Sequence, residues 1–120
     1  MKKNEFYVRL QLYLKLTDVL YSNYIESEKK FIYTKILRKY NGLILNLILD
    51  NPEFIIGKDF NDFINLIEHL SVWTEEWDHY FEKHKPGIND IFVFENKSIF
   101  PREFSIYLSN LDLSSIKNKK

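Results

Sequence analysis

The side chains best suited to chemistry gather between Asp59 and His84, a stretch that holds all three histidines and both tryptophans. Glu76 and His79 form one Glu-x-x-His pair, a spacing found in carboxylate-bridged di-iron bundles. Such a centre needs a second pair and further glutamates on facing helices, and the chain has no second pair. Cysteine is absent, so thiolate sites are excluded. We therefore predict neither a metal site nor a cofactor.

Patterns for nucleophilic or phosphate chemistry are also missing. No serine lies in a nucleophile-elbow context, and three isolated glycines do not form a phosphate-binding loop. Pairs of carboxylates arise by chance among seventeen acidic residues, so without geometry they predict no acid–base chemistry. We predict that the protein is not an enzyme.

Acidic side chains are the remaining chemical feature of residues 59–84. Glu68, Glu75 and Glu82 recur every seven residues, and Asp78 falls in the same stripe at about 100° per residue. The stripe is either solvated surface or a mimic of nucleic-acid phosphates that binds a basic partner. We predict the second use, with an apolar anchor at an exposed edge of Trp73 or Tyr80. The predicted partner-binding residues are Glu68, Trp73, Glu75, Asp78, His79 and Glu82.

Charge is divided unevenly along a chain whose formal net charge is zero. Residues 1–49 carry nine Lys and Arg against four Asp and Glu (+5), residues 50–96 carry three against eleven (−8), and the remainder carries five against two (+3). This asymmetry is an argument about partners rather than about fold. Alternatively, the oppositely charged helices neutralise one another within the domain.

The basic part of the chain, residues 1–49, suggests a second possible function. Lys29, Lys30, Lys35, Arg38 and Lys39 lie close together in the sequence, and basic helices neutralise nucleic-acid phosphates. The alternative to a protein inhibitor is therefore a small regulator or adaptor that binds nucleic acid through Lys29–Lys39.

Helical periodicity positions these residues and is strongest in residues 59–84. Asp59 is a plausible N-cap, and Pro86-Gly87 ends the run. The apolar face rotates by roughly 60° between the Phe63 half and the Trp73 half. That rotation predicts either a bend near residues 71–74 or two different packing partners.

Residues 5–24 fit two secondary structures. Strict alternation over residues 6–16 is typical of a strand, but a helical stripe continues past it to Tyr24, and we favour helix. Ser22-Asn23 is predicted to break this helix, and Ser27 to cap a second helix from about Glu28. Asn41-Gly42 either ends the second helix or lies within it at a small cost in stability. Residues 43–49 are therefore predicted as either helix or strand.

The pattern of the last third of the chain predicts an extended, buried run at residues 91–94 and a final helix opened by Pro101.

Hydrophobic residues make up 45% and aromatic residues 17%, which favours a packed core over disorder. We predict an all-α compact bundle of four or five helices in residues 1–113 and a flexible tail at residues 114–120. The alternative is an α+β fold if residues 6–16 form a strand. No secretory or membrane-spanning pattern is found, so we expect a cytoplasmic protein.

Two stretches resemble small bacterial immunity proteins. The opening LQLYLKLTDVLYSNYIESEKKFIYTKIL passes from a long helix through Ile25-Glu26-Ser27-Glu28 to a second helix near the aromatic Phe31. The later IFVFENKSIFPREF is similar in its Phe92, Phe94, Phe100 and Pro101. Proteins of that class accompany colicin-type or contact-dependent inhibition toxins and block the toxin's nuclease domain. The resemblance implies a toxin domain as the partner, and it carries over no individual functional residue.

Overall fold

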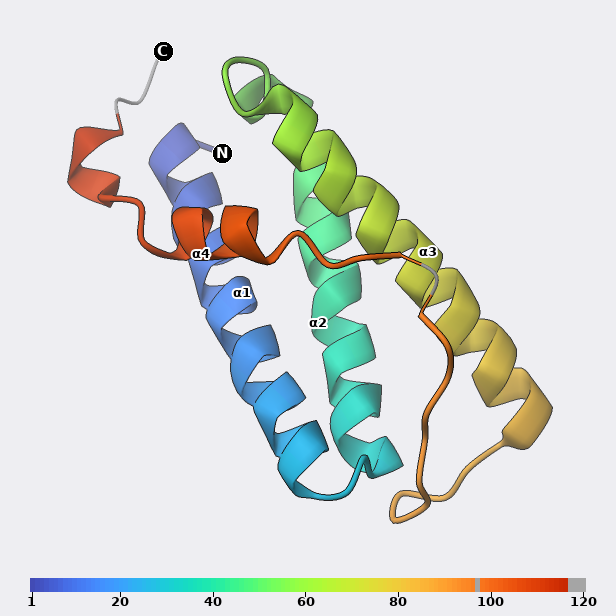
Figure 1. Ribbon diagram of the computed structural model, residues 1–120. Helices are drawn as coiled ribbons and strands as arrows, with labels where there is room; N and C mark the ends of the chain where they lie inside the picture. The colour runs from blue at the N-terminus through green and yellow to red at the C-terminus, as the bar shows by residue number, and fades with distance from the viewer. Residues whose placement is uncertain (97, 117–120) are drawn as a thin grey trace.

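The computed structural model describes residues 1–96 and 98–116, in which helices are the regular elements. Three long helices run down, up and down through the molecule in the view of Figure 1, and a short fourth helix lies across the first. The prediction of an all-α bundle is confirmed. In chain order the elements are α1 (Lys3–Glu26), α2 (Phe31–Asp50), η1 (Pro52–Phe54), α3 (Phe60–His84), α4 (Arg102–Ser109) and η2 (Leu113–Ser115).

Helix α1 settles the ambiguity between strand and helix at its residues. Its buried side chains Phe6, Leu10, Leu14 and Thr17 follow helical spacing, while Leu12, which a strand would bury with its neighbours, is 55% exposed. The α+β alternative is therefore excluded. The predicted break at residues 22–23 is wrong, because α1 continues to Glu26.

The predicted role of Ser27 as the cap of a helix starting near Glu28 is also wrong. Ser27 is the C-cap of α1, and α2 begins at Phe31. Between them Glu28 and Lys29 adopt left-handed backbone conformations, with φ of 63° and 66°, which are unfavourable for residues with a Cβ.

The first N–H groups of α2 find partners in a distant loop. The Phe31 N–H donates to the Asp90 carbonyl at 2.8 Å and the Ile32 N–H donates to the Ile88 carbonyl at 3.1 Å. The first four N–H groups of a helix have no partner within it. A tertiary contact thus supplies the capping that the local sequence was expected to supply.

Helices α2 and α3 are each continuous. Residues 41–49 belong to α2, so Asn41-Gly42 does not stop it. Helix α3 matches the predicted range, and of the two explanations for its rotating face the second is confirmed. Phe63 and Leu70 pack in one buried cluster with α1, whereas Trp73 and Trp77 pack in another with Phe31.

The connection from α3 to α4, of which residues 86–96 and 98–101 are described, forms a strap that returns along α2 and α3 and then crosses to α1 (Figure 1). The predicted burial of residues 91–94 holds fully for Phe92, which is 0% exposed, but Ile91 and Val93 are 67% and 43% exposed. Pro101 precedes α4 as expected.

The C-terminal part of the protein, α4 and η2, packs on α1. The Gln11 side chain donates to the carbonyls of Leu108 and Leu111 at 3.0 and 2.9 Å, which satisfies acceptors at the end of α4. The predicted tail boundary at residue 114 falls inside η2 (Leu113–Ser115). The remainder of that tail, residues 117–120, lies outside the described residues.

We predict that Trp77→Ala lowers the free energy of unfolding by about 3–5 kcal/mol, as expected for removal of a buried aromatic ring. Trp77 is 6% exposed, its ring is stacked on Phe31 and its N–H donates to the Thr34 hydroxyl at 3.1 Å. Urea denaturation followed by circular dichroism measures the change. The exposed His79→Ala is the control and should change stability by less than about 0.5 kcal/mol. Equal stability of Trp77→Ala and the native protein would contradict the buried position.

Candidate protein-binding surface

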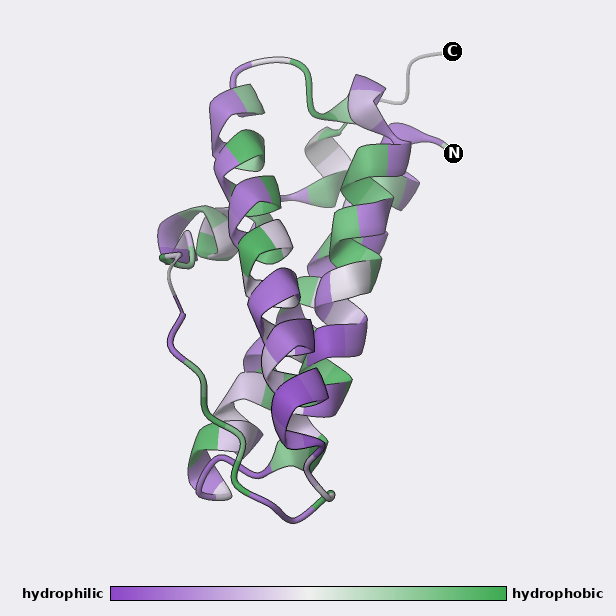
Figure 2. Ribbon diagram, turned by 90° about the vertical axis from the view of Figure 1, so that its right-hand side faces the viewer, coloured by the Kyte–Doolittle hydropathy of each residue, from purple (hydrophilic) through white to green (hydrophobic). Residues whose placement is uncertain are grey.

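The outward face of α3 carries most of the predicted partner-binding residues. Glu68, Glu75, His79 and Glu82 are all exposed, and at about 100° per residue they span roughly 60° of the helix circumference. Hydrophilic residues dominate the C-terminal half of α3 (Figure 2). We name these four residues the acidic stripe.

Glutamates of the acidic stripe are poorly neutralised. Glu82 approaches the Lys85 Nζ at 3.9 Å, with both side chains about three-quarters exposed (73% and 74%), a geometry that contributes little. For Glu68 and Glu75, no ion pair is found within residues 1–96 and 98–116. Their charges therefore face solvent.

Asp78 lies at the edge of this face and turns toward α2. Its carboxylate accepts two hydrogen bonds from Arg38, each at 3.1 Å, in a bidentate pair. The two side chains are 50% and 30% exposed. Gly42 leaves room for the guanidinium, because a Cβ there would stand 3.1 Å from Arg38 Nη1. The charge of Asp78 is thus matched within the protein, unlike those of the acidic stripe.

Trp73 is not part of the outward face. It is 9% exposed and packs against Phe94 of the strap with ring centroids 5.9 Å apart. The expected exposed edge of Trp73 beside the acidic residues is therefore not found. Tyr80 is half-buried against Phe92 and Phe94, at 4.8 and 6.1 Å between ring centroids.

Two other apolar side chains of α3 are exposed near the acidic stripe. Ile64, four residues before Glu68, is 43% exposed, and Phe60 is 41% exposed. Residues four apart on a helix are neighbours on its surface, so Ile64 adjoins the acidic stripe.

The basic segment Lys29–Lys39 is more dispersed than its sequence suggests. Lys29, Lys30, Lys35 and Lys39 are exposed, but the Arg38 guanidinium is occupied by Asp78. The structure therefore leaves four lysines on this side, divided between the α1–α2 turn and α2 itself.

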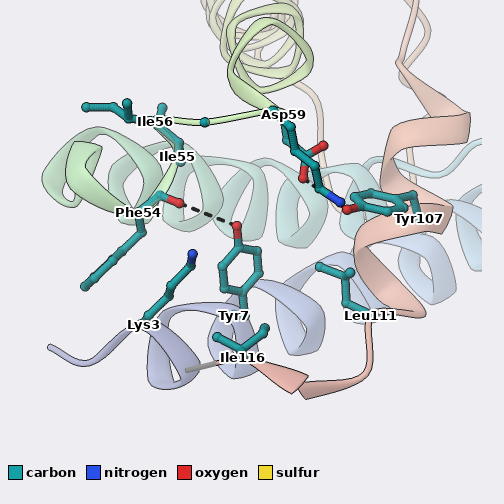
Figure 3. A pocket seen from close by; sticks show the side chains of 11 residues that line it. Lys3, Tyr7, Phe54, Ile55, Ile56, Asp59, Tyr107, Leu111 and Ile116 are labelled. Atoms are coloured by element: carbon teal, nitrogen blue, oxygen red, sulfur yellow. Dashed lines mark hydrogen bonds between the residues drawn. The ribbon is translucent and has the colours of Figure 1, made fainter. Parts of the chain in front are cut away.

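A cavity of about 230 Å³ lies between η1, the start of α3 and the C-terminal part (Figure 3). The Tyr7 hydroxyl donates to the Phe54 carbonyl at 3.5 Å, and the Tyr107 hydroxyl donates to Asp59 at 3.1 Å. Burial, with Asp59 and Tyr107 nearby, raises the pKa of Tyr7 to about 12. This phenol therefore stays neutral and acts as a hydrogen-bond donor. No spacing pattern connects these residues, so sequence reasoning could not find the cavity.

His69 lies inside the molecule, where α3 meets the strap. It is 4% exposed, its Nδ1 is 3.1 Å from the Ser98 hydroxyl, and its ring contacts Phe100 edge-on. Burial lowers its pKa from the usual value, since an imidazolium here would lose solvation. The histidine thus contributes to strap attachment in its neutral form.

No cluster of three His, Cys, Asp or Glu side chains suited to a metal ion forms among the described residues. The helices of the same residues include none with the length and apolar character needed to cross a membrane.

Comparison of the chain with protein-family models, curated proteins and solved structures finds no match.

Lowering the pH is expected to destabilise the protein through His69. The folded-state pKa lies below the unfolded value of about 6.5, so between the two the unfolded chain binds more protons. The free energy of unfolding therefore falls as pH drops from about 6.5 toward the folded pKa, and this contribution is fully present above about 6.5. Urea denaturation in steps between about pH 7.5 and 5 measures the slope.

The matched variants for this titration are His69→Gln and His79→Gln. The first retains a polar side chain toward Ser98 but cannot titrate, and it should remove the His69 component of the slope. The second changes an exposed histidine and should leave the slope unchanged. A native slope in His69→Gln would show that another group is responsible.

Proposed function

We propose that the protein is an inhibitor of the immunity type, which neutralises a bacterial toxin domain by binding it through the outward face of α3. The observation that carries this proposal is the acidic stripe. Three glutamates share one exposed face with His79, and none is held in a close ion pair among the described residues. In a chain with zero formal net charge, such a concentration of one sign favours a partner of the opposite sign.

A nuclease toxin fits the partner's required chemistry. Enzymes that bind nucleic acid present cationic surfaces to its phosphates. An anionic helix face competes for such a surface, and the attraction between opposite charges accelerates association. The resemblance of residues 10–37 and 91–104 to immunity proteins supports the same partner class.

Ile64 and Phe60 provide the apolar part of this proposed interface. Protein interfaces usually combine an apolar centre with a polar rim, and exposed aromatic or aliphatic side chains act as anchors. Both residues lie at the N-terminal end of the face on which the acidic stripe lies. We propose Ile64, Glu68, Glu75, His79 and Glu82 as the core of the binding face, with Phe60 at its margin and Asp78 excluded from its centre.

The alternative function, nucleic-acid binding by a regulator or adaptor through Lys29–Lys39, has less support. Arg38 is paired with Asp78, and the four exposed lysines are divided between the α1–α2 turn and α2 itself. A gel-shift experiment with mixed DNA and RNA at low salt tests it directly. Strong retardation that Lys35→Glu with Lys39→Glu abolishes would favour this alternative.

Reversing the glutamates of the acidic stripe is expected to abolish fast binding and leave the fold intact. The variant Glu68→Lys, Glu75→Lys, Glu82→Lys changes three exposed residues that are seven positions apart. Its association rate with the cognate toxin domain should fall by about ten- to a thousandfold at low salt. The native rate itself should decline as ionic strength shortens the Debye length toward about 8 Å.

A matched control carries the same change in charge on α1. The variant Glu5→Lys, Asp18→Lys, Glu26→Lys alters three exposed acids and should associate at close to the native rate. Circular dichroism confirms folding of both variants, and survival of cells that express the toxin measures protection. If the α3 triple variant protects cells with a native association rate, the binding face lies elsewhere.

A further inference from the structure

The strap contains a segment, residues 91–96, that runs over the aromatic cluster and is joined to the α1–α2 turn by an antiparallel β-bridge between Ile91 and Lys30. Phe92 is fully buried and Phe94 is half-buried, whereas Ile91 and Val93 point out at 67% and 43% exposure. Alternation of inward and outward side chains is the period of an extended chain. Figures 1 and 2 show this segment on the surface of the molecule, beside the C-terminal half of α3.

One edge of this segment is already paired. The Phe92 N–H donates to the Lys29 carbonyl at 2.9 Å, and the Phe92 carbonyl accepts from the Tyr24 hydroxyl. Burial raises the pKa of Tyr24 to about 12, so it remains a donor. Beyond Phe92 a cavity of about 210 Å³ lies between the segment and α1, lined by Tyr21 and Tyr24 of α1 and by Val93 and Phe94 of the segment.

The other edge is unpaired. Consecutive residues of an extended chain direct their N–H and C=O groups to opposite edges, so the groups of Ile91, Val93 and Glu95 face away from α1. Within the described ranges, none of these backbone groups makes a hydrogen bond to another part of the protein.

This edge also lacks most of the features that normally protect edge strands. Natural edges are blocked by proline, lysine, bulges or covering elements, because an open edge is a template for pairing with another chain. Residues 91–96 contain no proline and no basic residue, and their outward side chains are isoleucine, valine and one glutamate. The edge is therefore suited to accept a strand.

We propose that the edge of Ile91, Val93 and Glu95 binds an extended segment of the toxin domain, which adds to the strap as a β-strand. The occupant is a strand that alternates β-branched with basic residues. Its extended backbone follows from the unpaired donors and acceptors, and its basic residues follow from Glu95 and from Glu76, which lies on α3 one turn from both Trp73 and Tyr80.

The assignment of the toxin as the source rests on the proposed function, whereas the preference for an extended chain does not. Glu76 lies on the side of α3 between the strap and the acidic stripe. A strand added at this edge would run beside the stripe, so that one basic partner could contact both surfaces.

The probe is a short synthetic peptide that alternates lysine with valine or threonine, titrated into the ¹⁵N-labelled full chain and followed by amide chemical shifts. The expected shifts are at Ile91, Val93 and Glu95. The same peptide N-methylated on alternate residues keeps its charge but loses one row of donors, so it should bind about three- to tenfold more weakly. Equal binding of both peptides, or shifts confined to the acidic stripe, would overturn the proposal.

Val93→Pro removes one edge donor without removing the paired N–H of Phe92, and Val93→Ala removes the side chain but keeps the donor. The proline variant should bind the peptide about three- to tenfold more weakly than the alanine variant. Near-UV circular dichroism shows whether the aromatic cluster survives each change. If the proline variant loses this packing, the comparison of the two peptides on the native chain decides the outcome.

The toxin complex separates this proposal from the proposed function. Slowed amide exchange at Ile91, Val93 and Glu95 in the complex supports strand addition, and unchanged exchange there overturns it even when the acidic stripe proves essential. Conversely, peptide pairing at this edge together with full protection by the α3 triple variant would leave strand addition standing and remove the proposed role of the acidic stripe.

Discussion

The contact on which the rest of the structure depends is the backbone pairing between the α1–α2 turn and residues 88–92. Two N–H groups at the start of α2 have their acceptors in this segment, and the Lys29 carbonyl binds back to Phe92. The turn itself holds two residues at positive φ, a conformation that persists only where surrounding contacts favour it. The same pairing places Phe92 against Phe31, Trp77 and Tyr80. Without the strap, the second cluster under α3 would lose Phe92 and Phe94.

That arrangement also decides which side of α3 faces solvent. The strap covers the side of His69 and Trp73, α2 covers the side of Trp77, and Arg38 fastens Asp78 at the boundary. What remains uncovered is the acidic stripe with Ile64. The excess of acid in residues 50–96 is therefore only partly neutralised by the basic residues of α2, and three of its glutamates share one exposed face.

Much of this fold could be predicted because the signals are local and repeated. The range of α3 and its change of packing partner follow from apolar periodicity alone, since a rotation of the apolar face requires a second surface to pack on. The error at Ser27 has a different origin. Capping preferences are worth about 1 kcal/mol, and α2 instead begins at Phe31, where its first N–H groups donate to the carbonyls of Asp90 and Ile88. The alternation of residues 6–16 also fits a helix, because residues two positions apart on a helix lie on nearly opposite sides. Leu10 and Leu14 are accordingly buried, whereas Leu12 between them is exposed.

By itself, the sequence determined that the chain is helical, that residues 60–84 form its longest helix, and that Glu68, Glu75 and Glu82 share a face. These properties depend on spacing within one helix, and spacing is read directly from the chain. Only the tertiary structure decided that Asp78 is paired with Arg38, that Trp73 is buried under Phe94, and that the strap leaves one backbone edge open. Those properties depend on contacts between residues 20 or more positions apart along the chain. Such contacts are determined by side-chain packing and by the need of buried polar groups for hydrogen-bond partners.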